Sequence, residues 1–177
     1  MAKLILLQLN PQIHSGEEKV LAIFFDMNAL WEDWLLAIYR HSYRNDSTIK
    51  IPGKKRKTFW DTGHYTKVIE SDILIEKIAV DGQKETVVLD AKWKRPVGSK
   101  PADADLKQMF VYNMMWDSKE AWLVYPQING TTEICGNYAE HTKAGMMGMT
   151  FVDIFEKNMN LIKDLELPHL KMEQVET

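Results

Sequence analysis

An acid and an amine stand two positions apart at the end of an apolar run, in residues 87–94 (VVLDAKWK). Its aliphatic and β-branched residues favour a buried strand. Because side chains alternate across a strand, Asp90 and Lys92 share one face, and the apolar residues at the odd-numbered positions take the other. Unpaired charge is costly inside a protein. A carboxylate and an amine placed in this way therefore indicate either a chemical site or a structural ion pair.

A second carboxylate stands upstream, in another run that is typical of a strand. Asp72 directly precedes the apolar residues 73–75, which favours it over Glu70 and Glu76 as the partner acid. Divalent cations such as Mg²⁺ take oxygen ligands, and a bound cation can activate water. Two strand-borne carboxylates beside one lysine therefore predict a site that binds Mg²⁺ or Mn²⁺.

The elements on the amino-terminal side of these acids are predicted from spacing and turn residues. Apolar residues spaced three and four apart predict a helix over residues 17–44. Residues 45–57 are polar and basic, with a turn signal at Pro52-Gly53, and predict a connector before a strand that begins near Phe59. Residues 1–15 predict a strand or a short helix.

The acids themselves fall on a predicted hairpin. Residues 67–80 and 85–94 are expected to be adjacent antiparallel strands joined at Asp81-Gly82. The other predicted elements are a helix over 104–116, strands over 121–125, 131–138 and 147–151, and a final helix over 153–165. The resulting α-β-β-β-α-β order predicts an α/β fold with a mixed sheet flanked by helices.

Bulk properties exclude several classes of protein. The 177 residues predict one domain, and the net charge of −3 excludes a globally basic nucleic-acid coat. The single cysteine excludes an internal disulfide and a cysteine-based zinc site. No apolar run reaches the roughly 20 residues of a membrane span. We therefore expect a protein of the cytoplasm, without membrane association.

The element order, with Asp on one strand and Asp-x-Lys on the next, resembles the PD-(D/E)xK nuclease superfamily. Longer segments are similar to the nuclease domain of the McrC family of modification-dependent restriction systems. They stand in that family's order, at residues 25–34, 89–94, 105–112 and 121–126. The resemblance implies a restriction-endonuclease-like core over about residues 20–126 of a single domain 1–177, with a carboxy-terminal strand and helix extension over 127–177.

The resemblance implies a metal-dependent endonuclease that hydrolyses DNA phosphodiester bonds in a 5-methylcytosine-type restriction system. The expected metal ligands are Asp72, Asp90, the Ala91 carbonyl and Glu32, a residue of the first helix. For Glu32 two alternatives remain: it is a metal ligand, or it is a solvated residue on the surface of the helix.

Lys92 is expected to hold or deprotonate the attacking water, and Gln108 to orient the water or the lysine, with Tyr112 one turn further along the same helix. Residues 54–57 (KKRK) are either a solvated loop or contacts to DNA phosphates.

Proteins of this family work with an AAA+ GTPase partner resembling McrB, on which an additional amino-terminal domain docks. We expect this chain to lack that domain, as a nuclease domain from a longer protein or as a reduced version. No P-loop signature is present, so GTP hydrolysis is expected from the partner. Two alternatives remain open: a catalytically silent DNA-binding or partner-binding module with this fold, and a hydrolase that uses the two aspartates as an acid/base pair.

Overall fold

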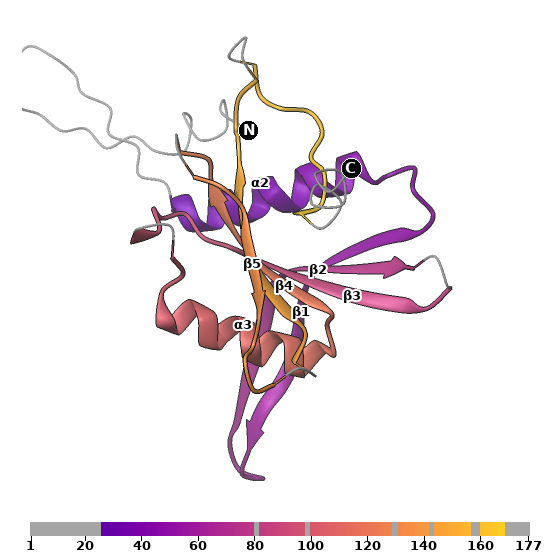
Figure 1. Ribbon diagram of the computed structural model, residues 1–177. Helices are drawn as coiled ribbons and strands as arrows, with labels where there is room; N and C mark the ends of the chain where they lie inside the picture. The colour runs from indigo at the N-terminus through magenta and orange to yellow at the C-terminus, as the bar shows by residue number, and fades with distance from the viewer. Residues whose placement is uncertain are drawn as a thin grey trace, which may run out of the picture.

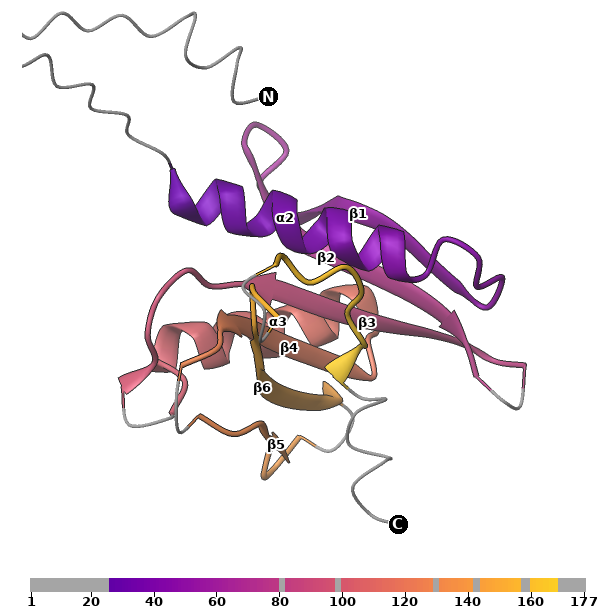
Figure 2. The same ribbon diagram turned by 90° about the horizontal axis from the view of Figure 1, so that it is seen from above.

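The computed structural model describes residues 26–79, 82–97, 100–128, 131–141, 144–156 and 160–168. Within them a six-stranded sheet lies between two helices, with α2 on one face and α3 on the other (Figures 1 and 2). The element predicted over 1–15, the first part of the helix predicted over 17–44, and Asp81 lie outside the described residues. No helix of the described part is long and apolar enough to cross a membrane.

The sheet is mixed, in the strand order β1-β2-β3-β4-β6-β5. Antiparallel pairing joins β1 to β2, β2 to β3 and β5 to β6, whereas β3, β4 and β6 are parallel. The strand bounds are β1 Ile49–Asp61, β2 Thr66–Ile78, β3 Lys84–Ala91, β4 Glu120–Pro126, β5 Ile134–Asn137 and β6 Met146–Val152. The predicted α/β class and mixed sheet are confirmed, and the order is consistent with a restriction-endonuclease-like core.

The helices pack through the apolar faces that their sequences predict. Helix α2 (Met27–Ser42) is capped by Asp26, whose carboxylate accepts the N–H groups of Asn28 and Ala29 at 3.0 and 3.2 Å. Its buried residues are Trp31, Leu35, Ile38 and Tyr39. Helix α3 (Asp103–Trp116) buries Met109, Tyr112 and Trp116 on the opposite face of the sheet.

The central strands are buried on both faces, so each contributes alternate residues to two cores. Val87, Leu89 and Ala91 join the core under α2, whereas Val88 joins the core under α3. This alternation confirms the predicted division of residues 87–94 into two faces and places Asp90 on the α3 side. Strand β3 ends at Ala91, earlier than predicted, although the Lys92 N–H still bonds the Val124 carbonyl at 2.9 Å.

The connector predicted over residues 45–57 is wrong, because β1 runs through it from Ile49 to Asp61. Proline is tolerated here because β1 is an edge strand, where a missing N–H costs no ladder bond to a second neighbour. Gly53 has a positive φ of 85° at a break in the register, a conformation that glycine adopts readily. The turn signal therefore marks an irregular strand and not a loop.

The final helix predicted over residues 153–165 is also wrong in its described part. The described residues there are not helical and contain an isolated bridge between Phe155 and Leu161. Leu165 and Leu167 are buried beside α2. Their N–H groups bond the side-chain oxygens of Ser42 and Tyr43 at 2.8 and 2.9 Å. These bonds satisfy the backbone outside a helix, so the apolar spacing fills the core without helical turns.

The outer part of the β1–β2 hairpin extends beyond the body of the sheet (Figure 1). We call this part, residues 55–71, the β1–β2 arm. Its strands leave the sheet next to α3 and join near residues 62–65. Most of its side chains are exposed.

Candidate active site

The two candidate acids lie where β2 and β3 separate. The ladder between these strands ends at the pair Ile73 and Leu89. Asp72 is the next residue of β2, and its Oδ2 accepts the Ala91 N–H at 2.9 Å, across the end of the ladder. The hairpin register thus brings Asp72 to the end of β3, where Asp90 lies.

A β-bulge in β2 also shapes this end of the sheet. Gly53 pairs with Leu74 and Lys55 pairs with Ser71, so Lys54 alone stands opposite both Asp72 and Ile73. Bulges bend a strand and re-aim its side chains, and they are frequent beside functional sites. The bulge lies at the point where β2 passes from the sheet into the β1–β2 arm.

Asp90 is 1% exposed and forms an ion pair with the Lys92 ammonium. Its Oδ1 accepts a hydrogen bond from Gln108 Nε2 at 3.0 Å. Its Oδ2 contacts Lys92 but is buried without a well-formed hydrogen bond. A carboxylate oxygen has two lone pairs, so one that contacts an ammonium can also bind a metal ion.

Gln108 links the lysine to the acid. Its Oε1 accepts from Lys92 Nζ at 3.1 Å, and its Nε2 donates to Asp90 and, at 2.8 Å, to the Tyr112 hydroxyl. The Tyr112 hydroxyl donates in turn to the Glu70 carbonyl at 2.6 Å. One chain of hydrogen bonds therefore runs from the backbone of β2 through α3 to Lys92.

Both acids are held in surroundings that disfavour their ionised forms. Burial, followed by the charge of Asp90, raises the pKa of Asp72 to about 7, although the Ala91 N–H acts in the opposite direction. Burial also raises the pKa of Asp90, and the neighbouring Lys92 ammonium opposes that shift. A bound cation would relieve the repulsion between the two carboxylates.

Glu32 is near the site but is held by another residue. Its carboxylate accepts from Lys54 Nζ at 2.7 Å, and its charge raises the pKa of Asp72 and of Asp90. In the described ranges, no group of three or more His, Cys, Asp or Glu side chains is placed to hold a metal ion. The structure thus brings together Asp72, Asp90, Lys92 and Gln108, with Glu32 engaged at their border.

The donor set that remains fits a hard cation in an open site. Asp72, Asp90 and the Ala91 carbonyl offer oxygens only, and Asp90 Oδ2 is a buried oxygen that contacts the Lys92 ammonium. Mg²⁺ is commonly bound through one or two carboxylates together with waters and substrate phosphates. A third protein carboxylate is therefore not required.

Two features of this region were not predicted from the sequence. Asp105 is 6% exposed, pairs with Lys94 at 2.5 Å and lies 3.9 Å from Lys92 Nζ. Its position three residues before Gln108 on a helix was the available signal, because such residues share a face. Lys54 is predicted only as part of the basic run 54–57, and its pairing with Glu32 had no signal, since the two residues lie 22 positions apart.

The sequence matches the model of a known protein family over residues 1–126. A family model described as McrBC 5-methylcytosine restriction system component matches residues 1–126, which include α2, the β1–β3 strands, α3 and β4. No curated protein matches the chain significantly. The chain belongs to the family of McrBC 5-methylcytosine restriction system components.

Proposed function

We propose that this chain is the nuclease domain of its restriction system and hydrolyses DNA phosphodiester bonds with a divalent cation. The observation that carries the proposal is the linked group of Asp72, Asp90, Lys92 and Gln108 at the separating ends of β2 and β3. A purely structural ion pair explains Asp90 and Lys92. It does not explain the second acid, Asp72, whose pKa is raised to about 7 beside Asp90.

Asp72, Asp90 and the Ala91 carbonyl would hold Mg²⁺ or Mn²⁺. When bound, the cation supplies positive charge to the phosphoryl group and lowers the pKa of water. Glu32 would join the site only by leaving Lys54, so we place it at the border of the cation site.

Lys92 would act on the phosphate and on the attacking water. Its side chain is 19% exposed, so it can reach a bound strand, and Asp90 and Gln108 fix the direction of its amine. An ammonium in this position donates hydrogen bonds to the attacking water or to a non-bridging phosphate oxygen. Hydrolysis then forms a bond from the water oxygen to phosphorus and breaks the bond to the leaving oxygen, which receives a proton.

Restriction by this domain would require a partner. No nucleotide-binding loop is present in the sequence. Because the chain is a component of a McrBC system, we propose that a McrB-like AAA+ GTPase supplies GTP hydrolysis and recognition of the modified base.

The test is cleavage of 5-methylcytosine-containing DNA with Mg²⁺, GTP and the partner GTPase. We expect Asp90→Asn and Lys92→Gln to lower the cleavage rate by about a hundredfold or more, the usual range for a lost catalytic group. Lys84→Gln is the matched control, because Lys84 pairs with Glu76 at the other end of β3. This variant should cleave DNA at the wild-type rate. Calorimetry with Mn²⁺ should show binding to the wild-type chain and weak or no binding to Asp90→Asn.

Cleavage by Asp90→Asn at the wild-type rate would overturn the nuclease proposal. A wild-type chain that binds DNA and the partner, but never cuts, would support the catalytically silent module instead.

A further inference from the structure

The β1–β2 arm begins at the candidate active site and carries charge unlike the rest of the chain. The arm, residues 55–71, contains four basic residues and two acidic ones, a net charge of +2 in a chain whose net charge is −3. Lys54 and Asp72, which mark the inner end of the arm, stand opposite each other at the bulge in β2. The arm is therefore a local basic surface that adjoins the acids.

The strand register places part of this charge on one face of the arm. Lys55 pairs with Ser71, Lys57 with Ile69, and Trp60 with Lys67. Paired side chains lie on the same face, and alternate residues of β2 share a face, so Lys55, Lys57, Trp60 and Lys67 lie together. Ile69 packs on the core under α3, which makes this the α3 side of the molecule. The side chains of Asp90 and Gln108 lie on the same side of the sheet.

The basic residues differ in how they are engaged. Lys57 donates to the Met115 carbonyl at 2.6 Å and lies over the Trp116 ring, so it fastens the arm to the end of α3. Arg56 pairs with Glu70. The Lys55 side chain has no hydrogen bond or ion pair with any residue that the structure describes, and the Lys67 ammonium contacts the ring of Tyr65.

Exposed aromatic side chains stand at the outer end of the arm. Trp60 is 54% and Tyr65 51% exposed, and their rings meet edge to face at 6.2 Å between centroids. Phe59 is also 54% exposed, at the third break in the β1 register. Large apolar side chains on a two-stranded ribbon contribute nothing to a core, so their contact with solvent suggests a binding surface.

We infer that the β1–β2 arm is a duplex-DNA-binding element that lies along a groove and holds the strand beside Asp72 and Asp90. Lys55 and Lys67 contact backbone phosphates, and Trp60 with Tyr65 makes apolar contact inside the groove. The inference rests on the proposed function, which makes DNA the substrate. The major groove admits a two-stranded β-ribbon.

The length of the arm is suitable for binding in a groove of duplex DNA. Seven residues from Lys55 to Asp61 at about 3.3 Å each extend for about 20 Å, the length of about six base pairs. The fastening by Lys57, and the hydrogen bond from Tyr112 to the Glu70 carbonyl, fix the inner half of the arm against α3. A duplex on the arm therefore passes the candidate site at a defined place.

Binding can be measured without cleavage, and so apart from the proposed chemistry. Fluorescence anisotropy of a short labelled duplex is followed in EDTA, with the full chain, from 50 to 200 mM salt. The variants are Lys55→Gln/Lys67→Gln and Trp60→Ala. The control, Lys84→Gln/Lys119→Gln, removes the same charge at the far end of the parallel strands.

We expect the double arm variant to bind about tenfold more weakly at low salt. Its slope of log affinity against log salt should be smaller by about two, since two phosphate contacts are lost. Trp60→Ala should lower affinity severalfold without changing that slope, because it removes no charge. The control should change neither quantity by more than a small factor.

Several results would overturn the inference: no binding by the wild-type chain at low salt, equal losses in the arm variant and the control, or tighter binding to single strands than to duplex. Normal DNA binding by the arm variants together with lost stimulation by the GTPase would assign the arm to the protein partner. The cleavage assay of Asp90→Asn tests the nuclease proposal, and the DNA affinity and salt dependence of the arm variants test the present inference. Either proposal can therefore fail while the other stands.

Discussion

Asp72 and Asp90 are held by different kinds of group. Asp90 has the Lys92 ammonium and the Gln108 amide, whereas Asp72 has one main-chain N–H, of Ala91. Asp90 is therefore in an ion pair, whereas Asp72 forms no ion pair with any residue that the structure describes and feels the charge of Lys92 only weakly. This difference makes Asp72 the residue whose ionisation should most affect the metal-free protein.

The pH dependence of stability should report on Asp72. Its pKa is about 7 in the folded chain, whereas the ordinary pKa of an aspartate side chain is 3.8. Between these values the folded chain keeps a proton that the unfolded chain loses, so stability falls as pH rises from about 4 to about 7. The fall is at most about 4 kcal/mol, and smaller after solvent screening.

The measurement is urea unfolding in EDTA at several pH values. Asp72→Asn should flatten this part of the profile and should be more stable than the wild-type chain at pH 8, with the difference shrinking toward pH 4. A wild-type profile that rises between pH 4 and 7 would contradict the assignment.

A substitution at Gln108 tests whether this residue positions the Lys92 amine. Gln108→Met keeps the volume but removes the bonds to Lys92, Asp90 and Tyr112. We expect kcat to fall by about tenfold to a hundredfold with little change in KM, because an untethered lysine loses the geometry that the reaction needs. Tyr112→Phe, one step further from the lysine, should have a smaller effect in the same direction. Unchanged kcat in Gln108→Met, or an effect on KM alone, would show that the amide has no part in positioning.

At the scale of elements, the close approach of β4 and β6 depends on a glycine. A Cβ at Gly148 would lie 2.3 Å from the ring of Trp122, which is fully buried and bonded through its indole N–H to Glu120 at 2.8 Å. The ring cannot move far because the cores on both faces of the sheet are packed around the central strands.

Gly148→Ala should therefore destabilise the protein by about 1–3 kcal/mol, the usual cost of overpacking. Gly136→Ala in the neighbouring strand β5 is the control, because nothing lies within 4 Å of its added Cβ. Urea unfolding of both variants checks the prediction, and equal stabilities would refute the packing account.

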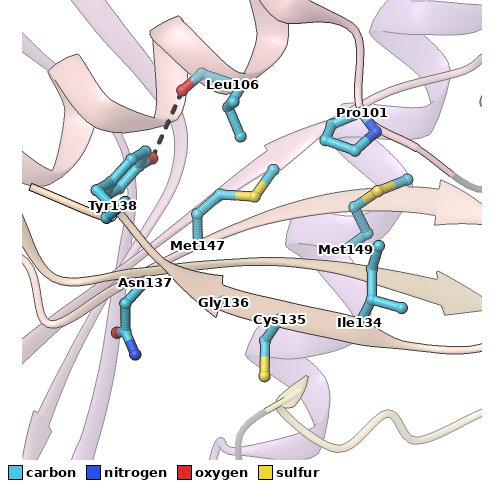
Figure 3. Close-up of a pocket in the computed structure, with 10 residues that line it drawn as sticks. Pro101, Leu106, Ile134, Cys135, Gly136, Asn137, Tyr138, Met147 and Met149 are labelled. Carbon is cyan, nitrogen blue, oxygen red and sulfur yellow. Dashed lines mark hydrogen bonds between the residues drawn. The ribbon is translucent and has the colours of Figure 1, made fainter.

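The elements also define an apolar pocket that the proposed function does not use. Figure 3 shows Met147 and Met149 of β6, Leu106 of α3 and Ile134 of β5 around it, with the Tyr138 hydroxyl bonded to the Leu106 carbonyl at 3.5 Å. Nothing in the described structure indicates what would cover it, and we assign it no role.

At the scale of the whole molecule, the distribution of charge limits what the chain does alone. The net charge of −3 gives no general attraction to DNA, so affinity depends on the arm and on the basic residues near the site. Binding through phosphates and groove contacts of this kind is expected to be nearly indifferent to sequence.

We expect the isolated chain to cut DNA slowly and a ring-forming GTPase partner with GTP to raise the rate by about tenfold or more, because assembly raises the local concentration of DNA at the site. Cleavage assays with the chain alone, with the partner, and with the partner and Asp90→Asn separate stimulation from contamination. Fast and sequence-specific cleavage by the chain alone would show that it carries its own recognition element.

The main elements could be predicted from the sequence, because their signals are local. The alternation in residues 87–94, the apolar spacing in α2 and α3, and the strands on either side of the hairpin gave the α/β class and put Asp90 and Lys92 on one face. Gln108 was identified as a candidate from family resemblance, and the structure places it in contact with both residues.

The tertiary structure alone decided the features that depend on contacts between distant residues. The bulge that sets Asp72 opposite Lys54 arises from a register mismatch across strands, and the pairing of Lys54 with Glu32 joins a strand to a helix. The non-helical path of residues 160–167 depends on Ser42 and Tyr43, more than 120 positions away, which accept its backbone N–H groups. Local spacing contains no information about such partners, because each bond depends on where the rest of the chain has folded.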